Sequence, residues 1–412
     1  MRILGALVLA AAAFGGDWPQ WRGPDLNGIS QENSLPLRWT TEENITWKLP
    51  LPAWSGSTPI LWGERIFLNV ADGNDLYLWC VDRSQAAVLW KKHLGGGNVK
   101  MRKQNMSSPS PVTDGKNVWV MTGTGILKSF DFNGNEIWGR DLQKDYGAFG
   151  LNHGYGSSPL LYEDSLYVQV LHGMKTDDPS YLLRIDKKTG KTLWRVERPT
   201  DAVQESPDSY TTPALLRYGR HTEIVITGGD YVTGHDPATG KELWRGGGFN
   251  LQKEQAYRII ASPVVFDGLI YCPTRVRPLL VFRAGGRGDI SQSHRAWAFQ
   301  NGPDVPTPVT DGKRIFVVND RGIVVALDAK TGRISWDRQR IEAGTYSSSP
   351  LLADAKIYAV NEEGTTTVLS AGDDFEVLAV NRLDSRTLAS PVAVGNQLFI
   401  RTADALYCLA KK

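Results

Sequence analysis

Cysteine is scarce in this sequence, with three residues in 412. Cys80, Cys272 and Cys408 lie far apart, and each falls in a strand-like stretch (YLWCVD, LIYCPT and LYCLA). An odd number of distant cysteines excludes a disulfide framework, so we expect buried free thiols. The sequence also shows no nucleophile and base pair and no His, Cys or carboxylate set with metal-ligand spacing. We therefore predict no catalytic residue and no metal site.

An excess of charge and a long apolar run are missing as well. The 46 basic and 44 acidic residues give a net charge of +2, which excludes the electrostatic footprint of a nucleic-acid or polybasic membrane-binding protein. The apolar run within residues 1–16 is too short to span a bilayer and ends in small residues, as in a secretory signal peptide. We expect cleavage between about Ala13 and Gly16, a periplasmic or secreted protein, and no transmembrane segment.

A repeat is present instead. A small hydroxyl residue, then proline and an apolar pair, recurs eight times at intervals of 41 to 54 residues. Each marker precedes a turn and a β-rich run such as TDGKNVWVM or FDGLIYCP, which is typical of tight hairpins. The marker prolines are Pro59, Pro111, Pro159, Pro213, Pro263, Pro308, Pro350 and Pro391.

A second marker, such as DKKTGKTLW or DPATGKELW, closes most repeats. In it Asp caps a turn, Gly takes the left-handed position, and Trp supplies a large surface to bury against a neighbouring unit. Because the slot recurs evenly, we interpret its tryptophans as structural docking residues. They are Trp47, Trp90, Trp138, Trp194, Trp244, Trp297 and Trp336.

The order of the markers at the two chain ends predicts how the repeats close. Trp47 precedes the first marker proline, whereas the last repeat ends without a Trp strand. The N-terminal strand should therefore complete the last unit and remove an exposed sheet edge. We predict an all-β, eight-bladed β-propeller of four-stranded antiparallel blades over residues 44–412. Seven blades are the alternative, because Ser370 replaces Asp in the seventh unit and no Trp follows it.

Residues 17–43 precede the propeller and carry WPQWRGP (18–24). Trp18 and Trp21 are large apolar surfaces on a segment that prolines hold extended, so we predict that the segment packs on the propeller as a fastener. The alternative is a ligand clamp with Arg22 as its charge.

The Asp-x-x-Thr-Gly-Lys-x-x-x-Trp marker resembles the docking motif of the pyrroloquinoline-quinone-type propeller repeats. The resemblance covers nearly all of residues 17–412 and implies the propeller fold. That family includes quinoprotein alcohol and glucose dehydrogenases and the propeller lipoprotein of the outer-membrane β-barrel assembly machinery. Exported relatives also begin with a stretch like Trp18 to Pro24.

This chain departs from the dehydrogenases of that family. It is shorter, it lacks an adjacent cysteine pair, and no Asp, Asn and Glu set aligns with their calcium and catalytic-base positions. It also departs from the assembly lipoprotein, because no cysteine stands directly after the predicted signal peptide. We expect a non-catalytic, monomeric scaffold that binds a protein or a cell-envelope component and no nucleic acid, without a cofactor. The alternatives are a dehydrogenase that uses pyrroloquinoline quinone with calcium, and a hydrolase or lyase.

Segments just ahead of each marker proline should line the central funnel, where propellers commonly bind ligands. Aromatic, amide and charged groups converging there would suit a polar ligand or an extended peptide, and the alternative is an unoccupied channel. Lys100, Arg102 and Lys103 are interpreted as a solvated basic loop. The predicted funnel residues are Trp54, Asn105, His153, Tyr155, Tyr210, Arg258, Asp304, Tyr346 and Arg386.

Overall fold

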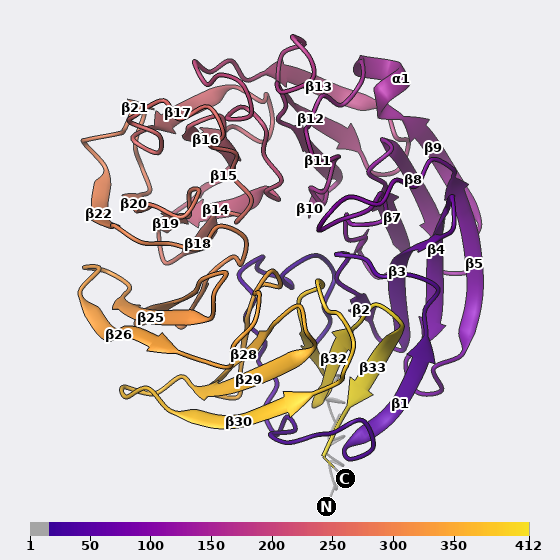
Figure 1. Cartoon of the computed structure of the whole chain (residues 1–412). Helices are drawn as coiled ribbons and strands as arrows, with labels where there is room; N and C mark the ends of the chain where they lie inside the picture. Colours follow the sequence, from indigo (N-terminus) through magenta and orange to yellow (C-terminus); the bar gives the residue numbers. More distant parts are fainter. Residues whose placement is uncertain (1–15, 412) are drawn as a thin grey trace, which may run out of the picture.

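The computed structural model describes residues 16–411, which form eight antiparallel sheets around a central axis (Figure 1). The predicted eight-bladed propeller is therefore confirmed, and the seven-bladed alternative is wrong. The predicted signal peptide lies outside the described residues except for Gly16. Within residues 16–411, no helix has the length and apolar character needed to cross a membrane.

The blades follow one another along the chain, and each runs from an inner strand at the axis to an outer strand. The first blade consists of β2 (Ile60–Trp62), β3 (Arg65–Asp72), β4 (Asp75–Asp82) and β5 (Val88–Gly95), and the second of β6 (Val112–Thr113), β7 (Asn117–Met121), β8 (Ile126–Asp131) and β9 (Glu136–Asp141). The third consists of β10 (Leu160–Tyr162), β11 (Ser165–Val170), β12 (Tyr181–Asp186) and β13 (Thr192–Glu197), and the fourth of β14 (Ala214–Tyr218), β15 (His221–Gly228), β16 (Tyr231–His235) and β17 (Glu242–Gly246). A short helix, α1 (Leu142–Tyr146), follows β9.

The remaining blades complete the ring. The fifth blade consists of β18 (Val264–Phe266), β19 (Leu269–Cys272), β20 (Leu279–Arg283) and β22 (Arg295–Phe299), and the sixth of β23 (Val309–Thr310), β24 (Arg314–Val318), β25 (Ile323–Asp328) and β26 (Ile334–Arg340). The seventh consists of β27 (Leu351–Ala353), β28 (Lys356–Val360), β29 (Thr365–Ser370) and β30 (Val377–Arg382), and the eighth of β31 (Val392–Val394), β32 (Gln397–Arg401), β33 (Ala405–Leu409) and β1 (Ile45–Pro50). A two-residue strand, β21 (Gly288–Asp289), adds to the fourth blade beside β17.

The N-terminal strand β1 forms the outer strand of the eighth blade. It pairs antiparallel with β33, and Trp47 lies opposite Cys408 (Figure 1, indigo beside yellow). The predicted closure is confirmed: two segments about 360 residues apart share one sheet, so β33 is not left as an unpaired edge.

Six of the seven docking tryptophans join their own blade to the next through one recurring contact. The indole N–H of Trp138 on β9 donates to the carbonyl oxygen of Lys187, in the β12–β13 turn of the next blade, at 3.0 Å. Gly190 in that turn has φ of +71°, and a Cβ there would lie 2.7 Å from the Trp138 ring. The repeated glycine is thus needed both for its conformation and for close approach. The same indole contact is made by Trp47, Trp90, Trp194, Trp297 and Trp336.

Trp244 is fully buried but docks differently from the other six. Its indole N–H donates to the Glu223 carboxylate within its own blade at 2.6 Å. The β20–β22 loop of the next blade, where the sequence departs from the repeat, supplies Arg287, whose Nη1 lies 3.0 Å from Glu223. A buried carboxylate and an arginine therefore replace the backbone carbonyl that the other docking tryptophans use.

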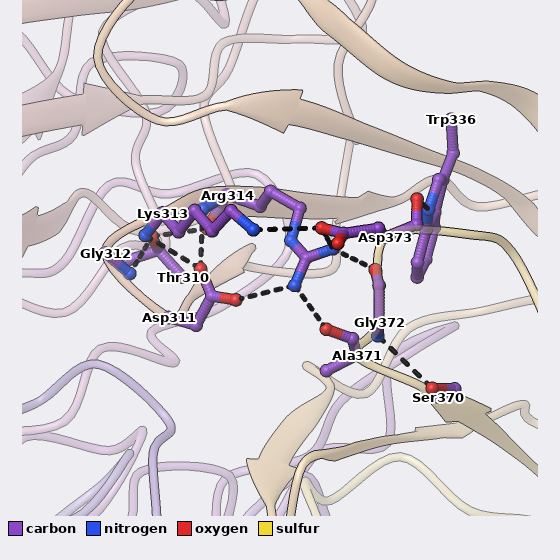
Figure 2. Close-up of polar contacts among 10 residues, drawn as sticks. All are labelled: Thr310, Asp311, Gly312, Lys313, Arg314, Trp336, Ser370, Ala371, Gly372 and Asp373. Carbon is purple, nitrogen blue, oxygen red and sulfur yellow. Dashed lines mark hydrogen bonds and ion pairs between the residues drawn. The ribbon is translucent and has the colours of Figure 1, made fainter.

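The seventh blade keeps the docking turn without its usual aspartate (Figure 2). The Ser370 hydroxyl accepts a hydrogen bond from the amide of Gly372 at 3.2 Å, and the carbonyl of Asp373 accepts from the Trp336 indole at 2.8 Å. Arg314 of the sixth blade donates to the carbonyls of Ala371 and Gly372 and lies 3.1 Å from the Asp373 carboxylate. These contacts hold the irregular turn against the sixth blade.

The missing tryptophan of the seventh blade is compensated from the N-terminal segment. Ala379 on β30 lies opposite Val368, the position that Trp occupies in regular blades. Trp39 is buried in the same apolar cluster as Ala379, and its amide donates to the side-chain oxygen of Asn381 at 3.0 Å. An aromatic residue from outside the repeat therefore joins the apolar cluster to which residues of the last two blades contribute.

Candidate functional site

The hydroxyl residues before the marker prolines form a closed ring of hydrogen bonds around the axis, which we call the hydroxyl ring. The backbone N–H of each member donates to the side-chain oxygen of the member in the next blade, at 2.9 to 3.3 Å. The last bond, from Ser390 to Thr58, closes the circle. The members are Thr58, Ser110, Ser158, Thr212, Ser262, Thr307, Ser349 and Ser390.

The N-terminal segment closes one end of the channel. Trp18 exchanges two backbone hydrogen bonds with Leu61 of β2, and the Gln20 side chain accepts from Leu161 of β10. Ile29 bridges to Leu352 of β27, and the Ser30 hydroxyl donates to Ala393. All of these partners follow the hydroxyl ring along the inner strands, whereas the predicted funnel segments precede it. The segment thus covers the base of the channel, opposite the end that we call the mouth.

Arg22 of this segment is buried behind the hydroxyl ring. Its guanidinium donates to the carbonyl oxygens of Asn27, Thr307, Pro308 and Pro350, and no described carboxylate pairs with it. Burial lowers the pKa of Arg22 to about 9. Arg22 anchors the segment to the sixth and seventh blades. Its guanidinium is buried beneath the ring, whereas a ligand-binding arginine would be exposed to the channel.

A cavity of about 330 Å³ remains between the mouth and the covered base. Its wall includes seven members of the hydroxyl ring, and Trp21 lines it from the N-terminal segment. Three predicted funnel residues, His153, Tyr210 and Arg258, line it as well. So do Arg102 and Lys103, which the sequence had indicated as a solvated loop.

One side of the mouth carries a charged cluster from three blades. Glu362 lies 2.9 Å from the Lys103 ammonium and 3.2 Å from the Arg386 guanidinium. Burial opposes ionisation of Glu362, but hydrogen bonds from Ser347 and Lys103 outweigh it and lower the pKa of the carboxyl. Arg386 also stacks over the Trp54 ring at 5.0 Å. Two predicted residues, Trp54 and Arg386, thus meet at the mouth.

The opposite side carries a second cluster. Glu205 lies 3.2 Å from His153 Nε2 and 3.7 Å from Arg258 Nε, and the Tyr210 hydroxyl accepts from the His153 amide. Asp208 is buried beneath them and accepts backbone N–H groups of Asn152, Gly173 and Met174. Burial outweighs these hydrogen bonds and raises the pKa of Asp208.

The other predicted funnel residues lie within the wall instead of on its surface. Asn105, Tyr155 and Tyr346 are buried. The Asn105 amide donates to the Trp54 carbonyl, and the Tyr155 and Tyr346 hydroxyls donate to the carbonyls of Gln169 and Glu342. Asp304 is half-buried, and its amide donates to Asp320. A ligand role for the predicted set stays a prediction.

Sequence reasoning missed the two mouth glutamates and the hydroxyl ring. Glu205 lies five residues before Tyr210 in the same predicted funnel segment, the β13–β14 loop, but was not among the predicted residues. Glu362 lies in the β28–β29 loop, which also faces the mouth. Counting both loops of each blade that reach the mouth would have included Glu362. The ring was visible as the hydroxyl residue before every marker proline, but its hydrogen bonds form only between blades.

Three family-model matches cover residues 39–149, 105–272 and 228–405. The family is described as outer membrane protein assembly factor BamB. The chain belongs to this family. The predicted resemblance is therefore confirmed at the level of the repeat.

Individual relatives share the fold with low identity. A tetrathionate hydrolase of Acidithiobacillus ferrooxidans is 21% identical over 85% of this chain, which spans 64% of that protein's length. BamB of Moraxella catarrhalis superposes with a TM-score of 0.65 at 14% identity, covering 89% of this chain and 97% of that one. A europium-containing methanol dehydrogenase superposes with a TM-score of 0.72 at 11% identity, covering 96% of this chain and 98% of that one. At these identities the structural likeness shows the fold alone.

The dehydrogenase fold raises the question of a quinone with a metal ion at the mouth. Among residues 16–411, no three His, Cys, Asp or Glu side chains converge to hold a metal ion. The three cysteines are free, buried and in separate strands. The described residues therefore do not fit that cofactor site, and we derive no redox step from it.

Proposed function

We propose that this chain is an exported, non-catalytic propeller that binds a protein partner, or a polymer of the cell envelope, on its mouth face. The family description supports an assembly role. The observation that carries the proposal is the placement of exposed apolar side chains. Six of the eleven that the described residues contain lie on outer strands. The other five, Val99, Met174, Val203, Leu251 and Val276, all lie on loops of the mouth face.

Four of these five belong to neighbouring loops of the third to fifth blades. Leu251 is 84% exposed, which is the largest value among the large apolar side chains described. Exposed apolar groups rimmed by charge are typical of protein interaction surfaces. We therefore favour a protein over a polysaccharide as the partner.

Hydrogen bonds and ion pairs hold these loops in place. Asp208 accepts the amide of Met174, which fixes the β11–β12 loop against the β13–β14 loop. The amide of Glu205 donates to the Gln255 carbonyl at 2.9 Å, and Lys253 lies 2.7 Å from Asp201. A surface ordered before binding loses little conformational entropy when it binds.

Site-specific photo-crosslinking tests the proposal. A photo-reactive amino acid at position 251 should give a discrete crosslinked protein in envelope extract, whereas position 330, in a turn at the base face, should give none. Leu251→Asp combined with Val203→Asp should abolish capture, and Leu89→Asp on an outer strand is the matched control. Equal crosslinking from both faces, or capture that survives the double variant, would contradict a mouth-face partner.

The expected absence of a cofactor remains a prediction with its own test. After incubation with pyrroloquinoline quinone and calcium, the purified protein should retain no quinone by absorbance and should oxidise neither alcohols nor sugars. Stoichiometric, calcium-dependent quinone binding would favour the dehydrogenase alternative instead.

A further inference from the structure

We propose that the hydroxyl ring, together with Arg258, binds a small oxyanion inside the channel that the N-terminal segment closes at its base. The ligand class is a sulfate, phosphate or carboxylate group. This site lies below the mouth-face loops, and it does not depend on whether a protein binds there.

The first observation is a set of unused hydrogen-bond donors. A Ser or Thr hydroxyl has one O–H donor besides its acceptor lone pairs. Each oxygen of the hydroxyl ring already accepts a backbone N–H, but no described residue accepts the hydroxyl hydrogen of any member. All eight side chains belong to residues that are at most 9% exposed, and seven line the cavity. Buried donors without an acceptor are costly unless a ligand or water accepts them.

The second observation is the sign of the charge around the cavity. Arg102, Lys103 and Arg258 line it, and no Asp or Glu of the described chain does. Glu362 lies outside the lining and already contacts two cations. Glu205 is 3.7 Å from Arg258 Nε, too far for a hydrogen bond, and that buried nitrogen has no other partner. Buried Arg22 adds a further positive charge behind Thr307.

These two observations select an anion over a neutral ligand. An oxyanion offers several acceptor oxygens to converging O–H donors, and charge-assisted hydrogen bonds of this kind are the stronger ones. A sugar or polyol could accept the same hydrogen bonds but would leave the cations uncompensated. The volume, near the lower limit of about 300 Å³ for ligand pockets, fits a small anion or the charged end of a longer molecule.

Calorimetric titration of the full chain at constant ionic strength tests the site. The probes are sodium sulfate, sodium acetate, erythritol as the neutral control, and a Gly-Ser hexapeptide with either a free or an amidated C-terminus. Sulfate should bind saturably and erythritol should not. If the free-acid peptide binds more tightly than acetate and the amidated peptide does not bind, the ligand is the carboxylate at a chain end. If acetate binds as tightly as the free-acid peptide, the ligand is a free small molecule.

Variants locate the site. Arg258→Met and Thr307→Val should each weaken sulfate binding at least tenfold. The controls are Thr307→Ser, which keeps the hydroxyl, and Arg283→Gln, on the exposed end of β20, and both should leave the affinity for sulfate unchanged. Crystals of the unaltered chain grown with selenate should show an anomalous peak within the ring, which keeps the test valid if Thr307→Val fails to fold. Unchanged affinity in Arg258→Met, erythritol binding equal to sulfate, or no saturable binding and no anomalous peak would overturn the proposal.

Discussion

At the scale of single residues, His235 links a buried cation to the docking turn of the fourth blade. Arg198 Nε donates to the Thr233 hydroxyl oxygen at 2.9 Å, which lies 2.9 Å from His235 Nε2. His235 Nδ1 lies 3.0 Å from the Gly240 carbonyl oxygen. A neutral imidazole satisfies this chain as donor at Nδ1 and acceptor at Nε2. Burial lowers the pKa of His235 to about 4.

A stability change with pH follows from this shift. The pKa of His235 in the folded chain is below the ordinary value of about 6.5, so the unfolded chain binds more protons between pH 6.5 and 4. As the pH is lowered through that window, the contribution of His235 should reduce the free energy of unfolding by about 3 kcal/mol. Urea unfolding at several pH values should show this slope, and His235→Gln should flatten it. Exposed His221→Gln is the control; a slope unaffected by His235→Gln would contradict the assignment.

Trp244 tests the docking tryptophans at the same scale. It is 1% exposed, so Trp244→Ala should cost about 3 to 5 kcal/mol through the cavity it leaves. Trp244→Phe keeps most of the ring but removes the donor to buried Glu223, and should cost about 1 to 3 kcal/mol. Urea unfolding measures both. Trp194→Ala should cost less than Trp244→Ala, because Trp194 is only half-buried; a loss below about 1 kcal/mol at Trp244 would mean that the slot is not structural.

At the scale of elements, the N-terminal segment is bonded to the inner strands at the base of the propeller. Trp18 is 2% exposed and is bonded to β2, so Trp18→Ala should lower the melting temperature by several degrees. Trp21→Ala should have a smaller effect, because Trp21 is half-buried and faces the cavity. Differential scanning calorimetry measures both. Rapid proteolysis within residues 17–32 of the folded protein would contradict the tight packing of the segment.

At the scale of the whole molecule, closure by β1 predicts one cooperative unit. Deleting residues 45–50 should expose an edge of β33, lower the melting temperature and promote association in light scattering. Trp47→Ala is the matched control, because it removes the docking ring but keeps the strand, and it should destabilise without association. An unchanged melting temperature and a monomeric deletion variant would contradict the closure.

Much of the fold was predictable from the sequence because its determinants recur. Every blade has a hydroxyl residue and a proline at the axis, and most have a Gly and a Trp at the outer contact, so periodic spacing predicted eight blades. The offset of Trp47 from the last repeat predicted how they close. The seventh unit was the weakest prediction, because its compensation by Trp39 and Arg314 comes from outside its own repeat.

The site was predictable only in part. His153, Tyr210 and Arg258 line the cavity as expected, whereas Asn105, Tyr155 and Tyr346 turn into the wall, because loop conformation decides which way a side chain faces. The sequence by itself determined the architecture, since the repeated contacts depend on residue type and spacing. Only the tertiary structure decided that the channel is closed at its base and lined by hydroxyls whose O–H groups find no acceptor among the described residues, because Arg22 and Thr307, separated by 285 positions, meet only once the ring has formed.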